Sequence, residues 1–359
     1  RKVFCQNWVH TAQMAMRLWH DFAGEFHRNA VSIEWQYTGL AFGHCATDNP
    51  EPISTEPTAM WFKNLRVYRL TYDTGLDPDK LEDALAENEF VPCGKVDRER
   101  AGWVPPIAAG GTMLTHTVGD CTMICLRKQE KVLPPAAINE QLEDRVTELE
   151  SREGRKAARR EKLSLKDEVT LDLLPRALTR SERIYAYFDF RRQYLLVDAA
   201  SAGKAEMLID YLRAVVKVLP VVPLDAHGDV ADIMTRWIKS RMPDAFTLDL
   251  DVELQNPQES RNVVRCRHQE IDSKEVLGHI DAGKRAIAVG LNWRDAIHFL
   301  MHADFAIKRL RFDDRIVDHG DASSDDAAES FDQDFAVMIV QLGRLLDELL
   351  EACGGPEKI

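Results

Sequence analysis

The sequence has few of the features that mark membrane or secreted proteins. It contains no run of about twenty apolar residues, which is the length a helix needs to cross a bilayer. Its first residues also lack the basic, apolar and small-residue order of a signal peptide. Its seven cysteines are odd in number and scattered, which favours reduced thiols over a disulfide framework. We therefore expect a cytoplasmic protein with no membrane partner.

Motifs for nucleotide binding and covalent catalysis are also missing. No glycine-rich segment ends in Gly-Lys-Ser or Gly-Lys-Thr, and none has the Gly-x-Gly-x-x-Gly spacing after a strand. A nucleophile-elbow sequence is likewise absent. Cys121 and Cys125 fall on one predicted strand without a second pair of ligands, which argues against a zinc site. The sequence therefore predicts no cofactor and no bound metal.

What the chain does contain is the alternation of strands and helices typical of an α+β fold with mixed or antiparallel sheets. Residues 1–59 end in a stretch rich in Pro, Thr and Glu, and we expect them to be a poorly ordered extension. We expect an N-terminal α+β part over 60–134, a projecting helical arm over 135–182, and a C-terminal α+β part over 183–359. The last part ends in a predicted amphipathic helix.

The predicted arm consists of two helices. Apolar residues recur at helical spacing within a segment crowded with charge, at Ile138, Leu142, Val146 and Leu149. So narrow an apolar face predicts a helix that projects from the body of the protein. Ser164 and Asp167 resemble a capping box that begins a second helix, which Pro175 then stops.

Charge is strongly segregated along the chain. The formal net charge is -13, yet the segment from 152 to 192 has a net charge of about +5. The bases at the centre of this segment are Arg155, Lys156, Arg159, Arg160, Lys162 and Lys166. On a helix they recur one turn apart and could follow a phosphate backbone. The alternative is a solvated helix tip whose bases pair with Glu153 and Glu161.

A second basic patch lies in a predicted strand over 261–269. Alternation along this strand would place Arg265, Arg267 and Gln269 on one side, where they could contact the same phosphate backbone. The alternative is an ordinary solvated face of a sheet.

An enzymatic function is also compatible with some residues. Asp249, Asp251 and Glu253 alternate on one predicted strand and could hold a divalent metal for phosphodiester hydrolysis. A half-buried strand with an acidic outer face has the same pattern, and no accompanying base is apparent. His298 and His302 would suit a metal on a helix, but their surroundings alternate as a strand does, which favours a structural role. We therefore predict a protein that is not an enzyme.

Several ordered motifs resemble those of a known family. They are MWFKNLRVYRL (60–70), FVPCG (90–94), GWVPP (102–106), SLKDEV (164–169), LLPRA (173–177), LPVVPL (219–224) and IKRLRF (307–312). As a set they resemble the RdgC family of recombination-associated proteins, and the resemblance begins at Met60.

This resemblance implies a non-enzymatic protein that binds double-stranded DNA with little sequence preference and restrains RecA-promoted strand exchange at the nucleoid. It further implies a ring-shaped homodimer whose basic inner surface encircles the duplex. The arm would then complete one closure of the ring, with Pro175 and Leu178 at the gate. Arg176 matches a family arginine at this point and joins the expected DNA-binding residues, whereas Leu178 replaces an aromatic residue found in some members.

Two other functions remain open from the sequence. One is the metal-dependent nuclease that would use the Asp249, Asp251 and Glu253 row. The other is a protein-interaction module whose basic arm docks on an acidic partner, such as RecA itself.

Overall fold

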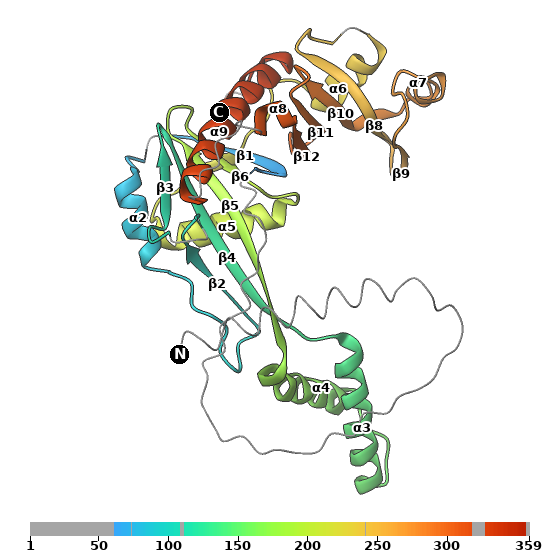
Figure 1. Ribbon diagram of the computed structural model, residues 1–359. Helices are drawn as coiled ribbons and strands as arrows, with labels where there is room; N and C mark the ends of the chain where they lie inside the picture. The colour runs from blue at the N-terminus through green and yellow to red at the C-terminus, as the bar shows by residue number, and fades with distance from the viewer. Residues whose placement is uncertain (1–60, 73, 108–110, 241, 318–326, 357–359) are drawn as a thin grey trace, which may run out of the picture. The chain divides into compact units, whose positions relative to one another are not determined.

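A single antiparallel sheet organises the described part of the chain. The computed structural model describes residues 61–356, apart from 73, 108–110, 241 and 318–326, so the predicted extension lies outside these residues. The sheet has twelve strands in the order β2-β4-β5-β6-β1-β12-β11-β10-β8-β9, with β3 paired to β4 and β7 paired to β1. Together with the helices α2 to α9, the sheet confirms the predicted α+β class (Figure 1).

The first part of the sheet has seven strands and one helical cover. The strands are β1 (Asn64–Leu70), β2 (Glu99–Val104), β3 (Thr115–Val118), β4 (Cys121–Val132), β5 (Leu178–Asp189), β6 (Tyr194–Val197) and β7 (Val221–Pro223). Helices α2 (Pro78–Ala86) and α5 (Ala202–Val215) pack on it and bury Leu81, Leu85 and Leu212. Asp77 caps α2 by accepting the Lys80 N–H at 2.9 Å.

The second part of the sheet shares its core with α6 and with the C-terminal helix. Its strands are β8 (Phe246–Asn256), β9 (Glu259–Cys266), β10 (Arg285–Trp293), β11 (Ile297–His302) and β12 (Ile307–Phe312). Its helices are α6 (Val230–Lys239), α7 (Lys274–Asp281), α8 (Asp314–Val317) and α9 (Ala327–Ala352). The predicted amphipathic helix is confirmed as α9, whose Phe335, Leu342 and Leu346 are buried. None of the described helices is both long and apolar enough to cross a membrane.

Strand β1 joins the two parts of the sheet. It pairs with β6 through Val67 and with β12 through Leu65. Alternate side chains of β1 enter two cores, because Tyr68 lies in the core with α2 and α5 whereas Val67 lies in the larger core with α9. The strands of residues 60–134 and of 183–359 thus share one sheet, and β5 already begins at Leu178.

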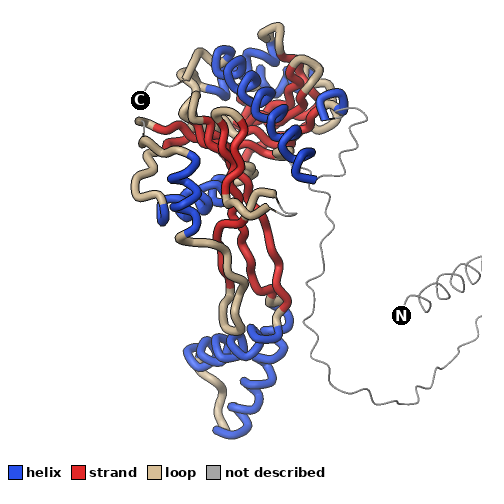
Figure 2. The backbone as a smooth tube through the Cα atoms, turned by 60° about the vertical axis from the view of Figure 1, so that its left-hand side comes forward, coloured by secondary structure: helices blue, strands red, loops and turns tan. Residues whose placement is uncertain are grey.

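The predicted helical arm lies at the end of the long ribbon formed by β4 and β5 (Figures 1 and 2). It consists of α3 (Pro135–Glu153), α4 (Arg159–Leu173) and the short 3-10 helix η1 (Leu174–Arg176). Gly154 ends α3 with a φ of 64°. The second helix begins at Arg159 rather than at the predicted Ser164, because Glu161 reaches back and accepts the Ala158 N–H at 2.7 Å.

Candidate nucleic-acid interface

The bases predicted to bind DNA are exposed on the turn between α3 and α4 and along α4. They are Arg155, Lys156, Arg159, Arg160, Lys162 and Lys166. Arg159 and Arg160 are the first two residues of α4, where the positive end of the helix dipole disfavours positive side chains. The free N–H groups of a helix start attract anions as these guanidinium groups do. Bases at the start of α4 therefore do not stabilise the helix itself, but they suit the binding of an anion there.

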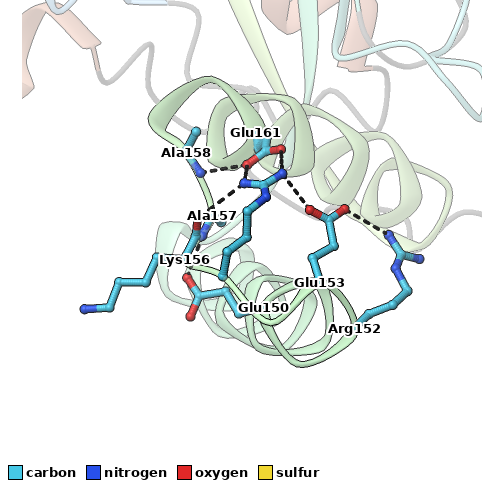
Figure 3. A network of polar contacts seen from close by, with 8 residues as sticks. Glu150, Arg152, Glu153, Lys156, Ala157, Ala158 and Glu161 are labelled. Atoms are coloured by element: carbon cyan, nitrogen blue, oxygen red, sulfur yellow. Dashed lines mark hydrogen bonds and ion pairs between the residues drawn. The ribbon is translucent and has the colours of Figure 1, made fainter.

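Arg155 differs from its neighbours because a polar network holds it. Figure 3 shows Glu153 and Glu161, the acids of this network, from close by. The Arg155 guanidinium contacts Glu161 at 2.6 and 2.9 Å and Glu153 at 2.6 Å. The hydrogen bond from Arg155, followed by that from the Ala158 N–H, lowers the pKa of Glu161 to about 2. The pairing that the sequence offered as an alternative therefore holds for Arg155, which shapes the turn.

The other bases of the arm tip have no such partner. Lys156, Arg159 and Arg160 make no side-chain ion pair or hydrogen bond with any residue that the structure describes. The same is true of Lys162 and Lys166 along α4. These five side chains are therefore available to a negatively charged ligand without breaking an internal contact.

The predicted gate residues lie where the arm returns to the sheet. Pro175 is exposed in η1, and Leu178 at the start of β5 is 81% exposed. Arg176, between them, is also exposed. Lys131 on β4 donates to the Leu174 carbonyl at 2.9 Å and fixes η1 against the ribbon. An apolar side chain as exposed as Leu178 suits a contact with another surface, and the gate assignment stays a prediction.

The second basic patch does not form one continuous strand face. Strand β9 ends at Cys266 instead of Gln269, and His268 takes a left-handed conformation with a φ of 54°. Arg265 pairs with Glu253 at 3.2 Å. Gln269 donates its side-chain amide to Glu275 at 2.9 Å. Arg267 is exposed and has no acidic partner in the described part of the chain. The three predicted residues therefore differ in their contacts and do not act as one basic face.

The acidic row on β8 is likewise divided among separate bases. Asp249 contacts the His298 ring at 3.2 Å, and Asp251 contacts Arg309 at 2.6 Å. Glu253 is the partner of Arg265 described above. Among the residues that the structure describes, no three His, Cys, Asp or Glu side chains form a group suited to a metal ion. Two acids of the row, Asp251 and Glu253, thus each balance the charge of one arginine.

The other candidate ligands lie in apolar or strand settings. His298 and His302 are on β11, which confirms the predicted strand. Burial, then the charge of Lys308, lowers the pKa of His302, so its neutral form is favoured. Cys121 and Cys125 are buried free thiols on β4, and burial raises the pKa of each to about 12. These cysteines are therefore packing residues.

Two further bases on β12 were not assigned to a site from the sequence. Arg309 and Arg311 are exposed, and Arg311 lies opposite His298 in the register of β11 and β12. The composition of their segment, IKRLRF, indicated a basic strand, because three of its six residues are bases. Their proximity to the acids of β8 could not be read from it, since Arg309 and Asp251 are 58 residues apart in the chain.

Comparisons with known proteins agree on one family. A family model described as "RdgC: Putative exonuclease, RdgC" matches residues 60–356. The "Recombination-associated protein RdgC" of Proteus mirabilis (strain HI4320) is 39% identical over 298 residues, which cover 82% of this chain and 99% of the relative. Proteins of the same name from Yersinia pestis (strain Pestoides F) and Yersinia pseudotuberculosis (serotype O:1b, strain IP 31758) are 40% identical over 298 residues, covering 82% of this chain and 98% of each relative.

Proposed function

This chain belongs to the RdgC family of recombination-associated proteins, and we propose that it binds double-stranded DNA without sequence preference and without chemistry on the DNA. In this proposal it restrains RecA-promoted recombination and associates with the nucleoid. It acts as a ring-shaped homodimer whose basic inner surface surrounds the duplex. The arm completes one closure of the ring through Pro175 and Leu178.

The observation that supports DNA binding best is the set of unpartnered bases at the arm tip. A chain with a formal net charge of -13 would repel DNA if its charge were spread evenly. Lys156, Arg159 and Arg160 instead remain exposed and unpaired within the described part of the chain, and two of them begin a helix. Contacts from such side chains to phosphates do not depend on base sequence.

A binding experiment on naked duplex DNA tests the proposal. We expect the wild-type protein to bind with steep salt dependence, because each phosphate contact adds about 0.9 to the slope of log affinity against log salt. Replacing Arg155, Lys156, Arg159 and Arg160 together by Glu should lower the affinity and flatten that slope. Fluorescence anisotropy over a series of salt concentrations measures both quantities.

The matched control changes the same number of charges elsewhere. Arg213, Lys217, Arg236 and Lys239 are exposed bases on or next to α5 and α6. Replacing these four by Glu gives the same net charge as the arm variant, but should preserve more of the affinity and nearly all of the salt slope. Equal losses in the two variants would mean that total charge, and not the arm, decides binding.

A metal-dependent nuclease is the second candidate, since the description of the matching family model contains the words "Putative exonuclease". It would use the row of Asp249, Asp251 and Glu253. Incubating DNA with magnesium or manganese separates the two functions. Strand breaks that disappear in Asp251→Asn would show that the protein is an enzyme and overturn the proposal.

The third candidate is a protein-interaction module whose arm docks on an acidic partner such as RecA. It predicts no binding to naked duplex in the absence of other proteins. A gel shift with purified protein and DNA alone therefore distinguishes it from the proposed function.

A further inference from the structure

A pocket of about 650 Å³ opens on the second part of the sheet, away from the arm. We call it the bulge pocket, since two irregularities of the sheet form it. The side chains that matter here are Asp249, Asp251, Arg267, Arg309 and Arg311, with Gly290 and Leu300 also among the lining residues. Its size is in the range of sites for small molecules and single nucleotides.

The first irregularity lies between β8 and β10. Leu248 faces Leu291 and Val252 faces Val289, so β8 has residues 249 to 251 where β10 has only Gly290. A side chain at Gly290 would crowd this bulge, because an added Cβ would lie 3.1 Å from the Asp251 carbonyl oxygen and 3.2 Å from the Asp249 Cβ. The extra residues redirect the two aspartates away from the regular alternation of the strand.

The second irregularity lies between β11 and β12 at the same level of the sheet. Lys308 faces Leu300, and after it β12 contains an extra residue before Arg311 faces His298. Arg309 sits in this bulge with a φ of 53°, a conformation that few residues other than glycine adopt. Because Leu300 also faces Gly290 across β10 and β11, the two bulges lie side by side.

The charges in the bulge pocket are arranged to leave two bases free. Asp251 accepts from Arg309 at 2.6 Å and from the His268 N–H at 3.3 Å. Asp249 accepts from the Leu250 N–H at 2.8 Å and contacts the His298 ring. Arg267 and Arg311, in contrast, are exposed and have no acidic partner among the described residues. The bulge pocket thus contains three arginines and two aspartates, and both aspartates already have internal partners.

We propose that the bulge pocket binds a phosphate group of a DNA strand, an inference that rests on the proposed DNA-binding function. Arg267 and Arg311 contact the phosphate oxygens, and Arg309 turns from Asp251 to the same group. Arginine suits this role because its planar guanidinium can make two parallel hydrogen bonds to one phosphate. The phosphate is either an internal phosphodiester or the terminal phosphate of a DNA end.

The test combines two variants with a control. Arg267→Gln with Arg311→Gln removes the free charges of the bulge pocket, and we expect about tenfold weaker binding and a salt slope smaller by about 0.9 for one lost phosphate. Asp251→Asn keeps an oxygen that can accept the His268 N–H but removes the charge that competes for Arg309, so we expect binding about two- to threefold tighter. The control is Arg213→Gln, which changes an exposed base on α5 that does not line the bulge pocket. This variant should bind as the wild type does.

Three DNAs of the same sequence identify the phosphate. Closed circular duplex has no ends, whereas linear duplex is prepared with either a 5′-phosphate or a 5′-hydroxyl. An equal loss on all three DNAs in the double variant assigns the pocket to internal phosphates. A loss confined to the 5′-phosphorylated DNA assigns it to a strand end.

Two results would overturn the assignment. One is a double variant that binds every DNA as well as Arg213→Gln does, and the other is weaker binding by Asp251→Asn. Unchanged melting temperatures would show that the variants remain folded, as we expect for changes at the exposed Arg267 and Arg311. Asp251 is partly buried, and its replacement by Asn keeps the size of the side chain. If the wild-type protein binds no naked duplex, the proposed function fails as a whole. If the arm reversal weakens binding and the double variant does not, only the bulge pocket is refuted.

Discussion

The arm and the sheet differ in how they hold positive charge, although Arg267 and Arg311 of the bulge pocket also lack an acidic partner among the described residues. On the sheet, Arg265 and Arg309 each contact a carboxylate that fixes the position of the guanidinium. At the arm tip, Glu153 and Glu161 hold Arg155, and Arg152 lies 4.0 Å from Glu153. Lys156 in the turn and Arg160 on α4 have no partner in the described part of the chain. Carboxylates on the sheet therefore fix the positions of single guanidinium groups. Most of the basic side chains at the arm tip, in contrast, are not fixed by any contact in the described part of the chain.

The same contrast appears in apolar burial. The larger core joins strands from both parts of the sheet to α9, and Phe335 is fully buried in it with its ring 5.7 Å from that of Tyr187. In the arm helices only Ile138, Val169, Thr170 and Leu174 are buried. Most of the folding stability should consequently reside in the sheet and its helices. The predictions below test this contrast.

The largest expected effect is on the core. Phe335→Ala should lower the free energy of unfolding by about 3–5 kcal/mol, because it removes a buried ring and leaves a cavity between the sheet and α9. The matched change in the arm is Leu163→Ala, where the side chain is 62% exposed and the cost should be within about 0.5 kcal/mol. Urea denaturation of both variants measures the difference. Similar costs would mean that the arm is as tightly packed as the sheet.

A smaller effect is expected from removing the arm. Val132 and Leu178 face each other at the end of the β4 and β5 ribbon, so an Asn-Gly turn can join them in place of residues 133–177. The unfolding free energy of the sheet should change by less than about 1 kcal/mol, because loop-closure entropy depends only weakly on loop length. Thermal unfolding and DNA titration of this variant would show a folded protein with much weaker binding. Loss of cooperative unfolding would instead show that the arm supports the sheet.

The smallest expected effect is a pH response confined to the arm. The contacts of Glu161 lower its pKa from 4.5 to about 2, so they stabilise the turn above pH 4.5 and are lost as the pH falls through about 2. Protection of the amides at the start of α4 from hydrogen exchange, taken relative to the intrinsic rate at each pH, should fall over this interval. Glu161→Gln should abolish the dependence, while Glu168→Gln, an exposed change farther along α4, should retain it. A retained dependence in Glu161→Gln would assign the response to another group.

Much of the architecture was predictable because it depends on local patterns. Alternation predicted strands at β8 and β11, and the apolar spacing of the last segment predicted α9. The start of α4 was placed too late, since Glu161 caps the helix from inside the charged run that obscured its beginning. The arm and its excess of positive charge were visible, but which base would be locked by Glu153 and Glu161 was not.

By itself, the sequence determined the α+β class, the separation of a basic arm from an acidic remainder, and the family. These follow from periodicity, composition and motif order, which are properties of neighbouring residues. Only the tertiary structure decided which charges are free and that Arg267, Arg309 and Arg311 share one pocket with Asp251. The reason is that this convergence depends on strand register and on two bulges, and both are set by the pairing of one strand with another and not by the residues of a single segment.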